Sequence, residues 1–414
     1  AFRRGIAAAF VSLSVLGAMG LLASSQAYDF AGSLTHASVS IYLYLAAIVF
    51  AAFIALKPLS HTRLFVNGLL VAGTVSAIAG LVGYFAVVPG ADDLFVRFER
   101  AAGTFKDPNV FGAFLVVPLL FAGHIALTRS WRAALPATVA AAIMLLAILM
   151  SFSRGAVLCL AVGGLAYAYL AFVTAPTHRQ RLKFALLVAG ATFGAIAIVS
   201  SALQNPDIGD VFTDRAQLFQ SYDEGPEGRF GGQFKAMAAI LDHPLGLGAL
   251  EFAPRLHPED PHNVYLAMFL NAGWVGGFVY LGLVLATLFL GLRHVLRRTA
   301  HQDLFVVAYA AFIGLVAVGL LVDTDHWRHF YIVVAMLWGM MAARQRPAQE
   351  LKRARSRSRT RGNRIRSRIV KAAAPRRRAT IKGPARRRIR NVPPIPRRRR
   401  ELNPRRPERI AHTA

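Results

Sequence analysis

The stretch DPHNVYLAMFLNAGWVGG, residues 260–277, places an imidazole and an amide directly before a long apolar run. An imidazole titrates near neutral pH, so His262 could accept a proton from a hydroxyl group during a transfer reaction. Asn263 could orient a polar acceptor or cap the helix that follows. A histidine at the start of a helix is also often only a cap or a solvated residue, so the sequence alone leaves both roles open.

Arginine residues recur in the short polar stretches between apolar runs. Arg154 lies in the turn SFSRGA, where a cation close to the hydrocarbon is energetically costly unless its surroundings stabilise it. Snorkelling to the interface or pairing with a loop acid would stabilise it, and so would a bound anion. The polar stretches also hold Arg97, Arg100, Lys106, Arg215, Arg229 and Arg328. Arginine offers planar pairs of donors that stay charged, so this pattern favours a phosphate-bearing substrate.

The elements that must position these residues are apolar segments long enough to cross a membrane. The chain of 414 residues is 55% hydrophobic with a mean hydropathy of +0.44, yet it carries a formal charge of +27. A spanning backbone must satisfy its own hydrogen bonds, so we expect an all-α polytopic membrane protein with about ten transmembrane helices. The expected spans are 5–24, 39–56, 64–88, 110–127, 133–150, 155–173, 184–203, 273–292, 304–322 and 329–343.

The charges of the connecting loops predict how these helices are oriented. When the helices alternate in direction, one set of loops is rich in lysine and arginine and the other in aspartate and glutamate. Basic loops stay on the cytoplasmic side, so both termini are predicted to be cytoplasmic and residues 204–262 to form one large extracytoplasmic loop. The span 5–24 also resembles a signal peptide, but a retained helix is favoured and cleavage would leave this orientation unchanged.

The apolar run after Asn263 is too long for one straight span. It reaches Leu292, and a helix of that length would cover roughly 43 Å against a hydrocarbon core of ~30 Å. Three glycines that begin at Gly273 provide a place to break it. We therefore expect 273–292 to span and 264–271 to form an interfacial or re-entrant segment.

Four stretches, in register along the chain, resemble the O-antigen ligase and polysaccharide polymerase superfamily. HNVYLAMFLNAGWVG is similar to its His-Asn and Gly-x-x-Gly signature, although Gly277 stands where the family usually has an aliphatic residue. AAGTFKDPNVFGAFL, which contains Asn109, resembles the first outer loop of the family. SRGA resembles its short basic turn, and EGRFGGQFKAMAAILDHPLGLGALEF resembles the Gly-Arg segment of its large loop.

The resemblance implies transfer of a glycan from a polyprenyl diphosphate carrier to an acceptor hydroxyl on the outer face of a bacterial inner membrane. Catalytic roles are then expected for His262 as general base, and for Arg154 and Arg229, which match the basic positions of the family, on the leaving diphosphate. The expected substrate-binding residues are Arg100, Arg215, Asn263, Asn109 and Arg328. The carrier diphosphate is already activated, so no metal and no cofactor are expected.

Other functions also fit parts of this sequence pattern. A ligase that uses a lipid acceptor and a polymerase that joins repeat units share the donor chemistry, so the motifs do not separate them; the single moderate loop slightly favours a ligase. A transporter or flippase of lipid-linked glycans should carry charges near the membrane midplane and repeated halves, whereas here the ionisable residues cluster at the outer ends. LHPEDPHN could also bind a metal, but its spacing fits no established zinc pattern.

Two further polar stretches have more than one interpretation. DTDHWRHF, residues 323–330, holds Asp323, Asp325 and Arg328, and it is either a solvated hairpin or part of the same outer cavity. GLG at 246–248 favours a tight turn over an anion-binding nest.

The last segment, 345–414, is polybasic and has few large apolar residues. Such a segment cannot bury a core, so we expect a disordered cytoplasmic tail after a transmembrane domain at 1–344. A basic tail beside a membrane helix favours anionic membrane lipid over nucleic acid as its partner. Cys159 lies inside an apolar span and is expected to be a buried, inert thiol.

Overall fold

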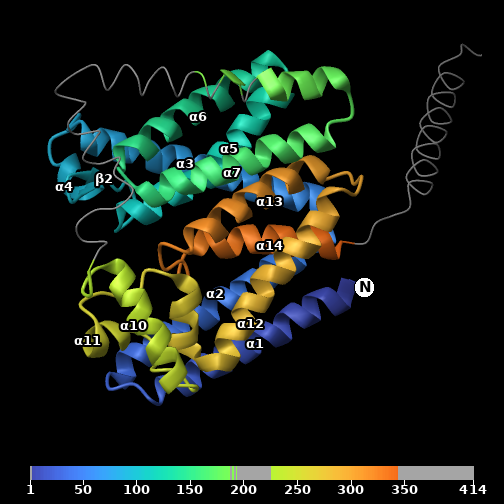
Figure 1. The fold of residues 1–414 in the computed structure, drawn as a ribbon. Coiled ribbons are helices and arrows are strands. Elements are labelled where there is room, and N and C mark those ends of the chain that lie inside the picture. Colours follow the sequence, from blue (N-terminus) through green and yellow to red (C-terminus); the bar gives the residue numbers. More distant parts are fainter. Residues whose placement is uncertain (1, 187–188, 191–192, 194–224, 344–414) are drawn as a thin grey trace, which may run out of the picture. The chain divides into compact units, whose positions relative to one another are not determined.

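The computed structural model (Figure 1) describes one compact unit, which lies within Ala1–Gln345. The described residues are 2–186, 189–190, 193 and 225–343. Three predicted features lie outside them: the basic tail, most of the expected span 184–203, and the part of the large loop that holds Arg215.

The described residues fold almost entirely into helices. The elements are α1 (Phe2–Ser24), α2 (Phe30–Leu56), α3 (Pro58–Tyr84), α4 (Ala91–Phe95), β1 (Val96–Arg97), β2 (Arg100–Ala101), α5 (Pro108–Thr128), α6 (Trp131–Met150), α7 (Arg154–Thr174), α10 (Arg229–Asp242), α11 (Phe252–Leu256), α12 (Val264–Val295), α13 (Gln302–Val318) and α14 (Arg328–Ala342). The two short strands pair antiparallel, with Val96 opposite Ala101.

Six of the described helices, α1, α2, α3, α5, α7 and α12, are long and apolar enough to cross a membrane. Shorter apolar helices in α6, α13 and α14 lie where further spans are expected. The all-α polytopic membrane class is therefore confirmed, whereas the total number of spans stays a prediction.

Two groups of helices meet along α13 and α14. In the first group, α1 packs against α2 and α12, and α14 packs against α2. In the second, α5 packs against α3, α6 and α7 (Figure 1). α13 joins the two groups because it packs against both α7 and α14.

Small residues allow α7 and α13 to approach closely. A Cβ atom on Gly314 of α13 would stand 2.6 Å from the carbonyl oxygen of Cys159 in α7, and Gly163 lies against the same stretch of α13. Glycine at such crossings is typical of helices that pack within a membrane. Cys159 is buried at this contact, as the sequence predicts.

The predicted break in the long apolar run is confirmed. α12 contains one residue with non-helical angles, Gly273, at φ 65° and ψ −175°. The loop that follows α10 fills the break: the N–H group of Leu247 donates to the carbonyl of Leu270 (2.8 Å), and that of Trp274 donates to the carbonyl of Pro244 (2.9 Å). These bonds satisfy backbone groups that the break releases from the helix.

Glycine is required on both sides of this junction. A Cβ on Gly273 would lie 2.7 Å from the carbonyl oxygen of Pro244, and one on Gly246 would lie 2.7 Å from that of Leu270. Both residues also have positive φ, which side chains disfavour. Gly277 has a different role, because a Cβ there would collide with the ring of Phe269, which folds back from the first half of α12.

Candidate functional site

Three connections that are far apart in the sequence meet at the start of α12. The N–H group of Asp29, just after α1, donates to the carboxylate of Glu251 in the segment before α12 (2.8 Å). The N–H group of Val264 donates to the carbonyl of Gly319, just after α13 (2.9 Å). The start of α12 is therefore held between the connection after α1 and the connection between α13 and α14.

Asn263, and not His262, caps α12. Its side-chain oxygen accepts from the N–H groups of Tyr265 (3.1 Å) and Leu266 (3.3 Å), two of the donors that a helix start leaves unpaired. Its own N–H group donates to Asp323 (3.0 Å). The cap role that the sequence left open for His262 is thus filled by its neighbour, and the imidazole is available for other contacts.

The imidazole of His262 lies between two carboxylates. Its Nε2 atom is 3.1 Å from Glu259 Oε2, and its Nδ1 atom is 3.8 Å from Asp323 Oδ2. The His262 side chain is 32% exposed, that of Asp323 is 25% exposed and that of Glu259 is 68% exposed. One edge of the ring therefore faces a sheltered acid and the other faces an acid at the surface.

Burial and like charges perturb the acids of this region. Burial, followed by the charges of Asp325 and Asp260, raises the pKa of Asp323 to about 7. Burial also raises the pKa of Asp260, although the charge of His262 opposes it. Desolvation and neighbouring carboxylates both disfavour the ionised form, which explains the direction of these shifts.

The first half of DTDHWRHF forms a tighter cluster with α2, which we call the His36 cluster: His36, Asp325 and His326. His36 Nε2 lies 3.0 Å from Asp325 Oδ2, and the rings of His36 and His326 stack with centroids 3.8 Å apart. Burial alone would raise the pKa of Asp325, but the hydrogen bond from His36 and the nearby imidazoles hold it below its usual value. DTDHWRHF is thus part of the site and not a solvated hairpin, although Arg328, the first residue of α14, is exposed.

A basic group gathers at the turn between α6 and α7. The Nε atom of Arg100 donates to the carbonyl of Ser151 (2.7 Å), and its terminal NH2 donates to Asn109 Oδ1 (2.8 Å). Asn109 is fixed in turn at the start of α5, where its N–H group donates to Asp107 (2.7 Å). The structure therefore brings Arg100 and Asn109 to the turn that carries Arg154, the first residue of α7.

The basic turn borders the acidic connection after α13. Gly155, next to Arg154, packs on the end of α13: a Cβ there would lie 3.1 Å from Val318 Cγ2 and 3.6 Å from Val322 Cγ2. Val322 directly precedes Asp323. The arginine turn and the acids around His262 are therefore neighbours across the end of α13.

Arg229 enters the site through α10. It is the first residue of that helix. One turn later Gly232 packs against the ring of His257, and a Cβ atom on Gly232 would lie 2.9 Å from the nearest atom of that ring. α10 lies on α12 through a small apolar cluster, and Trp274 Nε1 donates to the carbonyl of Ile240 (2.6 Å). Arg229 therefore begins a helix whose first turn packs on His257 and whose later part lies on the broken helix α12.

The sequence that forms much of this site matches a known family. Residues 139–281 match the family model described as O-antigen ligase. This stretch, which we call the O-antigen ligase domain, covers less than half of the chain. The match confirms the superfamily that the motifs indicate. A comparison with curated proteins gives no match.

The O-antigen ligase domain supplies Arg154, Arg229, His262 and the broken helix, and the rest of the site lies outside it. Arg100 and Asp323 bond residues of the domain from other parts of the chain. Asn109 bonds Arg100, and His36 bonds Asp325, so these residues support the site from behind. Sequence reasoning missed His36, whose only signal was a histidine at the predicted outer end of a span.

Two alternatives from the sequence find no support in the described residues of the ligase domain. In LHPEDPHN, His257 is buried against Phe252 and bonds the backbone of Glu259, and the histidine and acid side chains of this described stretch form no group with metal-ligand spacing. In GLG, the N–H groups of Leu247 and Gly248 donate to the α12 backbone, so the segment is a turn that closes the break and not a nest for an anion.

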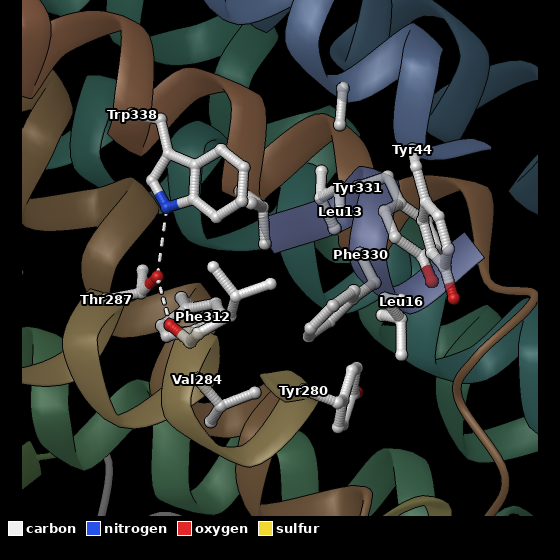
Figure 2. Close-up of a pocket in the computed structure, with 13 residues that line it drawn as sticks. Leu13, Leu16, Tyr44, Tyr280, Val284, Thr287, Phe312, Phe330, Tyr331 and Trp338 are labelled. Atoms are coloured by element: carbon white, nitrogen blue, oxygen red, sulfur yellow. Dashed lines mark hydrogen bonds between the residues drawn. The ribbon is translucent and has the colours of Figure 1, made fainter. Parts of the chain in front are cut away.

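A small apolar pocket lies among the helices (Figure 2). Its walls come from α1, α2, α12, α13 and α14, and Trp338 Nε1 donates to Thr287 Oγ1 within it (Figure 2). The pocket shares Leu16 and Tyr44 with a second pocket that His36 and Asp325 line. Its walls carry no charged side chain, so it is not a place for a diphosphate.

Proposed function

We propose that this protein transfers a glycan from a polyprenyl diphosphate carrier to an acceptor hydroxyl, without a metal in the chemical step. Glycan transfer of the O-antigen ligase or polymerase type follows from the family. The observation that supports the specific reaction is His262, freed from capping and held between two carboxylates beside an arginine turn. The reaction needs a base next to cations, and this end of the molecule offers both.

His262 acts as the general base. In the absence of substrate Nε2 donates to the Glu259 carboxylate (3.1 Å). When the acceptor hydroxyl displaces Glu259, the more sheltered Asp323 on the Nδ1 side can hold the proton on Nδ1 and leave Nε2 to accept one. Glu259 faces Nε2 from the surface and marks the place where the acceptor hydroxyl enters. The 3.8 Å separation on the Nδ1 side is expected to shorten when substrate binds, as catalytic hydrogen bonds often do.

The arginines act on the leaving group. As the acceptor oxygen attacks the anomeric carbon, the bond from that carbon to the carrier breaks and its electron pair passes to the diphosphate oxygen. Arg154 and Arg229 stabilise that charge, and Arg100 holds the Arg154 turn in place through Ser151. Arg215, which lies outside the described residues, remains a further candidate for the diphosphate.

The proposal also includes the membrane face on which the site lies and the type of acceptor. We place the site on the outer face of a bacterial inner membrane, with both termini in the cytoplasm, because the basic loops lie at the opposite ends of the helices. A lipid acceptor, as in a ligase, is preferred to a growing repeat-unit polymer. Anionic lipid is the proposed partner of the basic tail.

The test compares the glycans of cells whose only copy carries His262→Ala, His243→Ala or the unchanged sequence, at equal protein levels. His243 is an exposed histidine of the same domain and serves as the matched control. Long glycans stranded on the carrier in the His262 variant would indicate a ligase, and stranded single repeats a polymerase. A normal glycan profile would refute the role of His262 as base.

Transport of lipid-linked glycans is the alternative function from a different class of membrane protein. The broken helix α12 is a feature that transporters share, but here the break is closed by backbone hydrogen bonds from the loop after α10. Movement of a lipid-linked glycan across proteoliposomes without any transfer would favour the transporter.

A further inference from the structure

The His36 cluster joins two parts of the chain that are far apart in sequence. His36 belongs to α2, and Asp325 and His326 belong to the connection between α13 and α14. Two imidazoles and one carboxylate converge here, and their nearest donor atoms all lie within 4.8 Å of one another. Among the described residues, these three are the histidine, cysteine, aspartate or glutamate side chains that lie close enough together to share a metal ion.

The donor types and spacing suit a divalent transition metal. Zinc bonds imidazole nitrogen and carboxylate oxygen at about 2.0–2.2 Å in a tetrahedral arrangement, so two of its ligand atoms stand about 3.3–3.6 Å apart. His36 Nε2 and Asp325 Oδ2 are already 3.0 Å apart. The remaining separations, at no more than 4.8 Å, must contract by up to about 1.5 Å, which requires rotation of the imidazole side chains.

The surroundings already orient the three side chains. The main-chain carbonyl of Asp325 accepts from the hydroxyl of Tyr331 (2.7 Å), which fixes the residue that carries the carboxylate. A hydrogen bond between His326 and the backbone of His36 ties the two histidines together. Outer contacts of this kind are typical of metal ligands, because they set the direction in which each ligand points. Ser40 Oγ, 2.9 Å from His326 Nε2, stands where a fourth ligand or a water would bind.

We propose that His36, Asp325 and His326 bind one divalent metal ion of the zinc type, which clamps α2 to the connection between α13 and α14. The clamp is a positioning site and not part of the transfer chemistry. Asp323 is two residues from Asp325 and holds the backbone of Asn263, so the clamp keeps the Asp323 carboxylate at the start of α12. The inference goes beyond the proposed function, since it concerns what holds the site together.

The test measures binding of Co²⁺, a coloured substitute for zinc, to the full-length protein in lipid nanodiscs. The visible absorption of bound Co²⁺ reports nitrogen and oxygen ligands directly, without any assay of glycan transfer. We expect one equivalent of Co²⁺ for the unchanged protein, displaced by Zn²⁺. We expect His326→Ala and Asp325→Asn to weaken its binding by about tenfold or more.

His294→Ala is the matched control. His294 and His301 form another stacked histidine pair, with ring centroids 5.7 Å apart, but they belong to no such donor group. The control variant should bind Co²⁺ as the unchanged protein does. His326→Gln, which keeps a polar side chain of similar length, guards against a failure of His326→Ala to fold.

Two outcomes would overturn the proposal. If the unchanged protein takes up no Co²⁺ or Zn²⁺, the cluster is only a hydrogen-bonded pair of His36 and Asp325. If it takes up metal and the His326 and Asp325 variants bind equally well, the ions occupy another place. Either result would leave the proposed glycan transfer untouched, because the two readouts are independent.

Discussion

Two histidine–aspartate pairs take their aspartates from the same connection between α13 and α14, and they differ in how firmly they are held. His36 and Asp325 lie 3.0 Å apart with side chains 16% and 10% exposed, and His326 stacks on the first ring. His262 and Asp323 lie 3.8 Å apart with side chains 32% and 25% exposed. The first pair is tight and sheltered, and the second is loose and open on one side.

The difference separates a pair that holds the structure from a pair that can exchange partners with a substrate. A buried charge pair loses much when one member is removed, because the other is left without a partner in a poorly solvated place. A half-exposed imidazole can release a neighbouring carboxylate in favour of a hydroxyl group at little cost. The physical setting therefore supports the proposed catalytic role of His262 and a stabilising role of His36.

The largest expected effect is on catalysis by the open pair. His262→Ala removes the proposed base, so the rate of glycan transfer in reconstituted membranes should fall by about 10²–10⁴-fold. The protein should keep its thermal stability, because Asn263 and not His262 caps α12. If His262→Ala lowered the thermal stability as much as His36→Ala does, His262 would have a structural role like that of His36. The distinction between the two histidine–aspartate pairs would then be lost.

The next effect concerns the tight pair. His36→Ala leaves the sheltered carboxylate of Asp325 without its hydrogen-bond partner, which should cost about 1–3 kcal/mol of unfolding free energy. Thermal unfolding in the same lipid environment measures it, with Ser38→Ala on the exposed side of α2 as control. Unchanged stability would show that the contact does not hold α2 to the α13–α14 connection.

Asp323→Asn should give an intermediate result. The amide can still accept from the N–H group of Asn263, so the start of α12 stays in place, but it cannot hold a proton on the imidazole in the same way. We expect a loss of about tenfold in kcat with little change in KM. A change confined to KM would mean that Asp323 binds substrate instead of positioning His262.

Glu259→Gln should have the smallest effect. Its carboxylate is 68% exposed, and an exposed ion pair contributes little in water. Transfer rates are expected to stay within about twofold of the unchanged protein. A loss as large as that of Asp323→Asn would show that the surface carboxylate, and not the sheltered one, supports His262.

Much of the fold follows from local pattern. Apolar runs of membrane length predict helices wherever they occur, and the helices of the described residues lie at or near the expected positions. The break at Gly273 was also predictable, since the run is too long for one span and glycine tolerates the angles of a break. The family motifs likewise predict roles for Arg154, Arg229 and His262, and these roles stay predictions.

The sequence could not show which residues from elsewhere complete the site. Arg100 and Asn109 were named as substrate ligands, yet in the structure they bond to each other. His36 and Asp325 are joined across most of the described chain, and no local pattern links a histidine early in α2 to an aspartate after α13. Such pairings depend on which helices pack together.

The pattern of residues along the chain predicts that it spans a membrane, where its long helix breaks, and which family its central part is similar to. These features are local, because they depend on the length, polarity and spacing of neighbouring residues. Helix packing, which no local pattern shows, makes Asn263 the cap of α12, brings Asp323 to the Nδ1 side of His262 and joins His36 to Asp325. A hydrogen bond needs atoms within about 3 Å, and folding alone brings distant residues that close.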